Sequence, residues 1–462
     1  MAGAGGQFSS VERSITDALI ATIEATDFEQ MPAALVQFAK RSIYDTIAVA
    51  CAGARTPGMA KMSGAILAEA GSAFGPSTRW GADCKLSPTY AAFVNASHAA
   101  ALEYDSIHLK GIVHADAVTV PAALATAELK TSSGREFLRA VILGTEVACR
   151  LGLAASSRRG WFYTSIYGIF GATVATGVLS RLNPSGFNAA LGLALAQCSG
   201  AQQPQTSVTL AKPLQFGLAS RAAVFAALLA EQGLEGSCRT VEGSVGLYSL
   251  YETGRPESIL ASFGERFHMA DTAIKKYPCC SCSHAALDGL LSLIAQHHIQ
   301  AKDVDYLEAT ITPFMKKLVG FPFSPQADLQ ATTQFNLRYA LACALARGRF
   351  SLQETEPDVV ADPVIQSLTE KMHVIVDDSA DGIVGPCTIT VGLKGGQVVR
   401  ARMDDTPGAL GRPIDLEELE AKAIDCFRYG GITNQRSARI LKERIDGIED
   451  CENMAHFLDG VF

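Results

Sequence analysis

Helical periodicity runs through the first 268 residues of this 462-residue chain. Between residues 31 and 55 an apolar side chain stands at every fourth position, so one face of a helix is apolar along its whole length. The positions are Leu35, Ala39, Ile43, Ile47 and Cys51. A helix of this kind must bury its apolar face against another element. The first part of the chain is therefore expected to fold as a layered helical domain.

Helix boundaries can also be read from the sequence. Residues 9–12 and 133–136 both have the Ser-x-x-Glu spacing of a capping box, which begins a helix. Ser87 followed by Pro88 predicts the N-cap and first position of a helix that runs to about Tyr104. A further predicted helix, from residue 166, carries small residues that allow neighbouring helices to approach closely. They are Gly168, Gly171, Ala172, Ala175 and Gly177.

The pattern changes after about residue 270. Runs rich in apolar and β-branched residues predict strands, and a Gly-Gly pair between two runs predicts a hairpin. Strands are expected at 306–312 and 372–376, a hairpin at 387–403 turning at Gly395 and Gly396, and helices near 284–297 and 335–347. From about residue 415 the chain is helical and charged again.

These patterns predict a mainly α fold with an inserted α+β domain. The large all-helical domain is expected to comprise residues 1–268 and 405–462, because the tail returns to it. The smaller α+β domain is expected to cover residues 269–404.

Composition excludes several classes of protein. The net charge of −8 argues against a nucleic-acid partner, which requires a basic face. The first ten residues show no signal-peptide pattern, and no apolar run reaches membrane-spanning length. The 12 cysteines are too few for a disulfide scaffold and mostly lie in apolar runs. We therefore expect a cytoplasmic protein with no membrane partner, and we further expect a homodimer.

Titratable residues are crowded into ALEYDSIHLKGIVHADAV, residues 101–118. Glu103, Asp105, His108 and His114 alternate there with apolar residues, which indicates partial burial. Carboxylates and imidazoles that are buried side by side have the shifted proton affinities that proton transfer requires. The alternative interpretation is a helix end followed by a polar loop.

Lysines in apolar surroundings form a second candidate feature. Lys212 stands among apolar residues just before Pro213, although a lysine in such a place often extends its ammonium to solvent. Lys316 and Lys317 lie beside an apolar, proline-rich loop, where simple exposure is the alternative.

A cysteine-rich stretch, AIKKYPCCSCSHAALDG at 273–289, raises the question of a metal. Cys280, Cys282 and His284 could in principle chelate one. However, adjacent Cys279 and Cys280 do not form a zinc knuckle, and no second knuckle follows. We therefore predict no metal. Thiol chemistry is a further possibility, with no single cysteine distinguished from its neighbours.

Cations together with a base suit one class of substrate. Small di- or tricarboxylates need lysines to hold them and a base that removes a proton next to a carboxylate. The sequence contains no glycine-rich phosphate loop after a strand, which argues against a nucleotide.

At these residues the chain resembles the MmgE/PrpD family, which includes 2-methylcitrate dehydratase, cis-aconitate decarboxylase and iminodisuccinate epimerase. The family's A-L-D-F-D-D-T-H and later second His are similar to ALEYDSIH and LKGIVH here. AKPLQFG at 211–217 resembles T/A-K-P-L/F-x-x-G, and IKKYPCCSCSH resembles K-x-Y-P-x-x-x-x-x-H. The resemblance covers nearly the whole chain.

The resemblance implies a helical domain built from both chain ends, a smaller α+β lid, an active site in the cleft between them, and no cofactor. It also implies catalytic roles for four residues, namely Glu103, His114, Lys212 and Lys275. We add His108 and Tyr163 as candidate catalytic residues. Substrate binding is assigned to Asp105, Lys212, Lys275, His284 and Lys317.

The chain also departs from the family pattern. Where the family shows G-F-H-P-T-S or G-W-H-x-T, residues 160–165 read GWFYTS, so Phe162 stands in place of the expected His. Tyr163 is then the nearest acid, or else a tyrosine packed under Trp161. Ser106 and Ile107 replace the signature's third Asp and its Thr.

Three functions follow from this reading. The first is an enzyme that removes a proton next to a carboxylate of a small polycarboxylate and then eliminates water or carbon dioxide. The second is an epimerase or isomerase that returns the proton, which the loss of the expected His favours. The third is a degenerate, non-catalytic member of the family.

Overall fold

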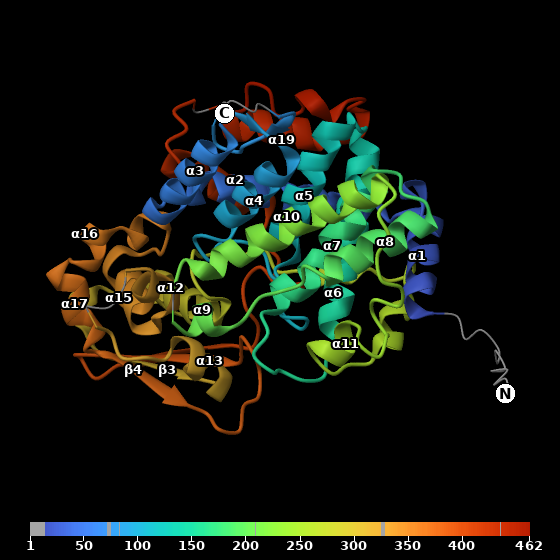
Figure 1. Ribbon diagram of the computed structural model, residues 1–462. Coiled ribbons are helices and arrows are strands. Elements are labelled where there is room, and N and C mark those ends of the chain that lie inside the picture. Colours follow the sequence, from blue (N-terminus) through green and yellow to red (C-terminus); the bar gives the residue numbers. More distant parts are fainter. Residues whose placement is uncertain (1–13, 72–74, 83, 208, 325–328, 435) are drawn as a thin grey trace, which may run out of the picture.

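The computed structural model describes residues 14–71, 75–82, 84–207, 209–324, 329–434 and 436–462. The chain forms a large body of helices and a smaller body that combines helices with a sheet (Figure 1). Each body has its own cluster of buried apolar side chains. The two clusters meet in sequence between Ile274 and Tyr277, close to the change in pattern at residue 270.

The first part of the chain gives the large body eleven of the α-helices described, and a small hairpin. The helices are α1 (Ile15–Ala25), α2 (Ala33–Gly53), α3 (Pro57–Ala70), α4 (Pro88–Ala99), α5 (Ala115–Lys130), α6 (Gly134–Ala154), α7 (Tyr163–Leu179), α8 (Pro184–Leu195), α9 (Gln203–Thr206), α10 (Ala211–Glu231) and α11 (Leu247–Leu250), and the hairpin pairs β1 (Ser77–Thr78) with β2 (Lys85–Leu86). The predicted helices at 31–55 and 87–104 correspond to α2 and α4, and the helix predicted from residue 166 begins earlier, at Tyr163.

Two predicted helix starts have different outcomes. The capping box at 133–136 is confirmed, because Ser133 and Glu136 bond each other's backbone amides at the start of α6. The one at residues 9–12 lies outside the described residues. α4 begins at Pro88 as predicted, but it ends at Ala99, short of Tyr104. Glu103 adopts a left-handed backbone with φ of 51°, so an α-helix cannot continue through it to Tyr104.

Small residues allow the central helices α6 and α7 to pack closely. A Cβ added at Gly171 would lie 2.4 Å from the carbonyl oxygen of Gly144 and 2.7 Å from the Cβ of Ala148. A Cβ added at Gly144 would in turn lie 2.6 Å from the carbonyl oxygen of Gly171. The two backbones therefore touch through paired glycines, as the small residues of this segment predict.

One described helix, α10, is long and apolar enough to cross a membrane by length and composition, although polar and charged residues interrupt its apolar run. In the fold, 61% of its most apolar window is buried, and it packs against α4, α7 and α8. Core helices of globular domains pass the same test, so this is weak support for a membrane span.

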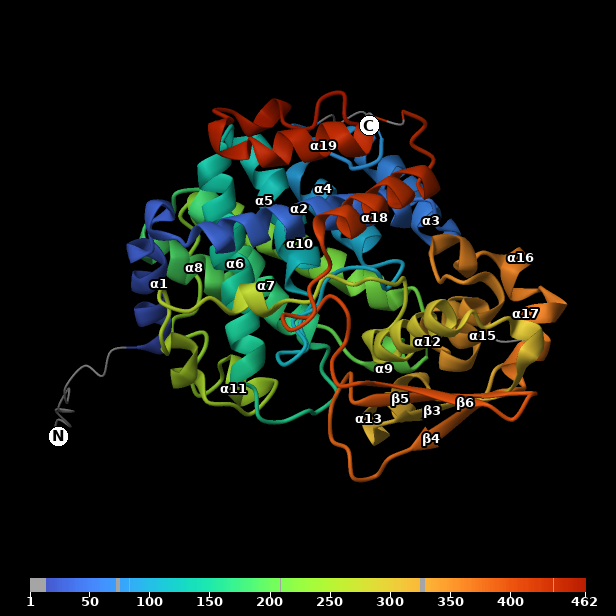
Figure 2. The same ribbon diagram turned by 180° about the vertical axis from the view of Figure 1, so that it is seen from behind.

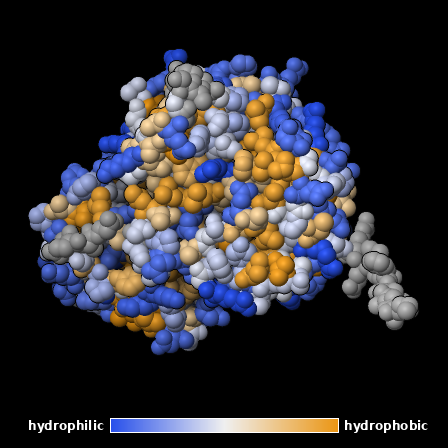
Figure 3. Space-filling view, viewed as in Figure 1, coloured by the Kyte–Doolittle hydropathy of each residue, from blue (hydrophilic) through white to orange (hydrophobic). Residues whose placement is uncertain are grey.

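The exposed face of α10 carries Leu218 and Phe225, which are 45% and 46% exposed. In the space-filling view, apolar side chains follow this helix across the front of the molecule (Figure 3). The expected homodimer stays a prediction, and an apolar face of this kind is a surface that it could use.

The small body is built on a four-stranded sheet with the order β4-β3-β5-β6, in which β3 runs parallel to β4 and antiparallel to β5. Its strands are β3 (Val304–Ile311), β4 (Met372–Val376), β5 (Cys387–Leu393) and β6 (Val398–Met403), and its helices are α12 (His284–His297), α13 (Pro313–Val319), α14 (Leu329–Phe335), α15 (Leu337–Arg347), α16 (Pro357–Val360) and α17 (Pro363–Thr369). α12 packs against β5 and β6, and α15 packs against α12. The predicted strands, hairpin and helix 284–297 are confirmed.

The C-terminal tail lies on the large body. Figure 2 shows α18 (Leu416–Tyr429) alongside α2, with α19 (Ser437–Asp446) on the same side of the molecule. α18 begins with a capping box between Asp415 and Glu418. Its buried face carries Lys422, whose ammonium lies 2.6 Å from the Asp45 carboxylate on α2.

The paired glycines give a test of this packing. We predict that Gly171→Ala lowers the apparent melting temperature, at a cost of about 1–3 kcal/mol, because its methyl group would force α6 and α7 apart. Gly64→Ala is the matched control on α3, where an added Cβ meets nothing within 4 Å. It should stabilise by about 0.5–1 kcal/mol, through helix propensity alone. Equal shifts of the two variants in thermal unfolding would contradict the close contact.

Candidate active site

The loop between α4 and α5 brings the polar residues of 103–114 together. Two backbone hydrogen bonds, of 3.0 and 2.8 Å, join Ile107 of the loop to Ala273. Within the loop, His108 and Val113 form an antiparallel β-bridge. Ala273 belongs to the segment that joins the two bodies. The loop and this connecting segment are therefore held side by side.

Glu103 is the centre of a buried ion cluster. Its carboxylate contacts the ammonium of Lys212, in the first turn of α10, and lies 3.3 Å from the ammonium of Lys275, in the connecting segment. Lys275 also donates a 2.8 Å hydrogen bond to the Glu103 carbonyl. All three side chains are at least nine-tenths buried. One carboxylate between two lysines leaves one positive charge for a bound anion.

Burial has a direct effect on Lys212. Desolvation, helped by the positive charge of Lys275, lowers the pKa of Lys212 to about 7. The Glu103 carboxylate works in the opposite direction, since it stabilises the charged ammonium. Lys212 can therefore gain or lose a proton near neutral pH.

His114 and Asp105 form the second part of the site. His114 is the N-cap residue of α5, and its Nδ1 lies 2.7 Å from an Asp105 carboxylate oxygen. Its backbone N–H donates to the Thr164 hydroxyl at 3.1 Å, and its ring packs edge-on against Phe216 at 5.5 Å. Burial alone raises the pKa of Asp105, but His114 and Lys275 outweigh it and hold this pKa below its usual value. Asp105 stays ionised and orients the imidazole.

A cleft between the two bodies joins these groups. Its inner part has a volume of about 80 Å³ and is lined by the predicted residues Glu103, His114, Tyr163, Lys212 and Lys275. The rest of the wall is largely apolar: it includes Ile107, Leu109, Ile112, Phe162, Phe314, Leu318, Ile383 and Val384. A few charged groups therefore face a mostly apolar space, as in many small-molecule sites.

Tyr163 reaches the cleft, but its hydroxyl is occupied. It donates to the carbonyl of Ser157, and burial together with Glu252 raises the pKa of Tyr163 to about 12. Its ring packs against Tyr167, whereas Trp161 packs against Tyr251. A phenol held in this way is a poor proton donor to a substrate.

Two predicted histidines lie outside the cleft. His108 accepts a hydrogen bond from the Gly111 N–H at 2.9 Å, and burial lowers its pKa to about 4. His284 lies with its Nε2 3.2 Å from the Cys279 carbonyl, and burial lowers its pKa to about 3. Each ring contacts a backbone group instead of the cleft, so neither histidine is placed to touch a substrate in the inner cleft. Asp105 acts through His114.

The remaining predicted residue, Lys317, lies farther out. It is exposed and lines an outer chamber that opens from the inner cleft. Arg158 lines the same chamber, and its guanidinium lies 5.6 Å from the centre of the Phe314 ring. Sequence reasoning did not identify Arg158, because an exposed arginine in a polar loop carries no distinguishing pattern.

The cysteines are distinguished only by the fold. Cys280 and Cys282 line the inner cleft, whereas Cys279 is buried beside them. A hydrogen bond from Cys282 lowers the pKa of Cys280 to about 6. Within the described residues, Cys280, Cys282 and His284 do not bring their ligand atoms together as a metal site.

One described group does bring three ligand atoms within 4.8 Å: His108, His268 and Asp271. Two of the three side chains already have other partners. Gly111 N–H occupies His108 Nδ1, and the Arg266 guanidinium lies 3.0 Å from the Asp271 carboxylate. An arginine bound to the only carboxylate of the group disfavours a cation there.

Lys422 was missed by sequence reasoning, yet it supports the whole site. Its ammonium donates 2.9 Å hydrogen bonds to the carbonyls of Tyr104 and Lys275, and it is paired with Asp45. It therefore ties the Glu103 loop to the connecting segment. A signal was present: Lys422 lies on the apolar face of its helix with Leu419 and Cys426.

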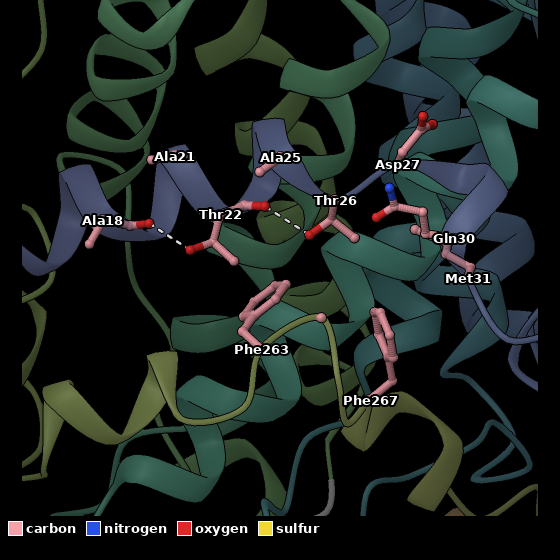
Figure 4. A pocket seen from close by; sticks show the side chains of 11 residues that line it. Ala18, Ala21, Thr22, Ala25, Thr26, Asp27, Gln30, Met31, Phe263 and Phe267 are labelled. Carbon is pink, nitrogen blue, oxygen red and sulfur yellow. Dashed lines mark hydrogen bonds between the residues drawn. The ribbon is translucent and has the colours of Figure 1, made fainter.

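A separate groove lies on α1, on the side of the large body away from the small one (Figures 1 and 4). Small side chains of α1 face Phe263 and Phe267 across it. The hydroxyls of Thr22 and Thr26 donate to carbonyls of their own helix, at 2.8 Å each. Asp27 is the charged residue among its described lining, so the groove does not suit an anion.

Comparisons with known proteins match the chain to one family. A family model described as the MmgE/PrpD N-terminal domain matches residues 17–259, and one described as the MmgE/PrpD C-terminal domain matches residues 277–447. The chain is similar to a cis-aconitate decarboxylase of Aspergillus terreus, with 28% identity over 94% of this chain and 93% of the relative. It is also similar to the cis-aconitate decarboxylase of Homo sapiens, with 26% identity over 97% and 95% of the two chains.

A third relative, the cis-aconitate decarboxylase-like protein oryM of Aspergillus oryzae, is 26% identical over 90% of each chain. The relatives are thus matched along nearly their full lengths, and the family models cover both bodies of the structure. The resemblance seen in the sequence motifs is confirmed, and the chain belongs to the MmgE/PrpD family.

Proposed function

We propose that the chain is a lyase that removes carbon dioxide from a small unsaturated polycarboxylate and protonates the carbon left behind. The observation that carries this proposal is the Glu103–Lys212–Lys275 cluster beside the His114–Asp105 pair in one cleft. The names of the relatives support the same reaction class.

In this proposal the lysines bind the substrate and His114 transfers the proton. Lys212 and Lys275 hold the carboxylate that the product retains. As the carbon–carbon bond breaks, its electron pair moves into the conjugated system of the substrate, next to these cations. His114, in its protonated form and oriented by Asp105, then donates a proton to carbon. Water returns a proton to His114 before the next turnover.

The apolar wall favours loss of carbon dioxide over loss of water. A carboxylate pressed against Phe162 and Ile112 is poorly solvated, whereas neutral carbon dioxide is not disfavoured there. A departing hydroxyl, in contrast, needs a proton from an adjacent acid. Tyr163 is a poor candidate for this acid, because its hydroxyl donates to the Ser157 carbonyl, and in this proposal His114 supplies its proton to carbon.

The second candidate is an epimerase or isomerase. The observation that favours it is the presence of two groups in one cleft that can exchange protons, His114 and Lys212, the latter with its pKa lowered to about 7. An epimerase needs one proton carrier on each side of the substrate carbon. A non-catalytic relative would have no reason to keep this costly buried cluster.

The test is to incubate the protein in deuterated water with cis-aconitate and with other di- and tricarboxylates, and to follow each by NMR. Decarboxylation gives released carbon dioxide and a product with one deuterium at the protonated carbon. Exchange with inversion of a centre indicates the epimerase, and a new alkene without carbon dioxide indicates a dehydratase. No exchange or product with any compound would leave the non-catalytic alternative.

For His114 we predict that His114→Gln lowers kcat about 10²–10⁴-fold, because it removes the proton donor. The apparent melting temperature should change little, since glutamine keeps a polar side chain beside Asp105. His297→Gln, at an exposed position on α12, is the control and should retain full activity. A His114→Gln variant with unchanged turnover would refute the assignment.

For Lys212 we predict that kcat/KM falls as the pH rises through about 7. Above its pKa the lysine loses the positive charge that holds the substrate carboxylate, so binding weakens on the alkaline side. Lys212→Met should raise KM and remove this fall, whereas the exposed Lys302→Met should change neither. If the alkaline fall persists in Lys212→Met, another group is responsible for it.

A further inference from the structure

We infer that the substrate carries an unbranched apolar substituent of several carbons, which occupies the outer chamber while the reacting carboxylates occupy the inner cleft. This inference rests on the proposed function, because it extends the same site and names its substrate class.

The sizes of the two spaces provide the first argument. The inner part has a volume of about 80 Å³. The outer chamber measures about 560 Å³, within the range of small-molecule sites. Most of the space available to a substrate therefore lies in the outer chamber.

The two spaces are continuous. Ile112, Tyr163, Gln202, Gln205, Phe314 and Leu318 line both of them. Phe335 marks the passage: it lines the outer chamber, and the Lys212 ammonium lies 5.4 Å from the centre of its ring. A ligand whose carboxylate is held at Lys212 therefore has its remaining atoms directed along Phe335.

The walls of the outer chamber suit an apolar chain. Phe314, Leu318, Phe321 and Phe335 come from the small body and face the large body. Phe321 is 56% exposed, so its ring offers apolar surface that a bound alkyl chain would cover. The amide of Asn336 is already bonded to the carbonyls of Phe321 and Pro322, at 3.3 and 3.1 Å.

The charged side chains that line the outer chamber are exposed to solvent. Arg158 and Lys317 are both exposed, and they raise the local concentration of anions without fixing one in place. Additional carboxylates of a small substrate would lie against phenylalanine and leucine side chains and lose hydration. An alkyl substituent has no hydrated polar group to desolvate there, and its apolar surface is removed from water.

The experiment uses 2-alkylsuccinates, from methyl to octyl, and measures each dissociation constant by calorimetry. Affinity should rise about fourfold for each methylene buried in the outer chamber, until the chamber is filled. Alkyl analogues of the unsaturated substrate should show the same trend in kcat/KM.

Two variants fill the chamber from opposite walls. Ala331→Phe on α14 and Thr206→Trp on α9 line the outer chamber and not the inner cleft. Each should abolish the gain for the octyl compound and leave methylsuccinate binding unchanged. Ala361→Phe, at an exposed position of the small body, is the control for added bulk and should keep the gain. Using two walls keeps the test valid if one variant fails to fold.

The outcomes separate the two proposals. If methylsuccinate binds in a Lys212-dependent way but affinity is flat or falls with chain length, the apolar-substituent inference is wrong and the proposed function stands. If methylsuccinate does not bind, and no polycarboxylate exchanges protons, the proposed function itself fails. A gain with chain length that survives both filling variants also overturns the inference, because the chain then lies elsewhere.

Discussion

A single buried carboxylate, Glu103, determines how the site is built. Taking a carboxylate and two ammonium groups out of water costs several kcal/mol for each ion, and only close pairing offsets this. Glu103 finds its partners 109 residues away, at Lys212, and 172 residues away, at Lys275. The loop after α4, the first turn of α10 and the connecting segment must therefore meet at one point. Removal of any one partner would leave an uncompensated charge in the interior.

The tail of the chain completes this arrangement. Lys422 on α18 bonds the carbonyls of Tyr104 and Lys275, the residues beside and within the ion cluster, and its charge is balanced by Asp45. The C-terminal helix thus acts on the site through backbone contacts and needs no contact with a substrate.

The apolar surroundings of the cluster decide its chemistry. In water, Lys212 would be fully charged at neutral pH, and a bound carboxylate would be well solvated. In the cleft, burial lowers the pKa of Lys212, and apolar side chains such as Phe162 and Ile112 line much of the wall. In the reaction that we propose, these surroundings favour the departure of a charged group as a neutral molecule.

Periodicity and turn chemistry act over a few residues, so the sequence alone predicted the stripe of α2, the start of α4, the capping box of α6 and the hairpin at Gly395 and Gly396. Motifs likewise predicted Glu103, His114, Lys212 and Lys275, which the fold brings to one cleft.

Long-range contacts decided the rest. The Glu103 carboxylate depends on Lys212 and Lys275, and the hydroxyl of Tyr163 depends on where Ser157 lies. His108 and His284 turn to backbone groups, and Lys422 reaches the site from the far end of the chain. Such partners are set by packing in three dimensions, because hydrogen bonds and ion pairs form between neighbours in space, whatever their separation along the sequence.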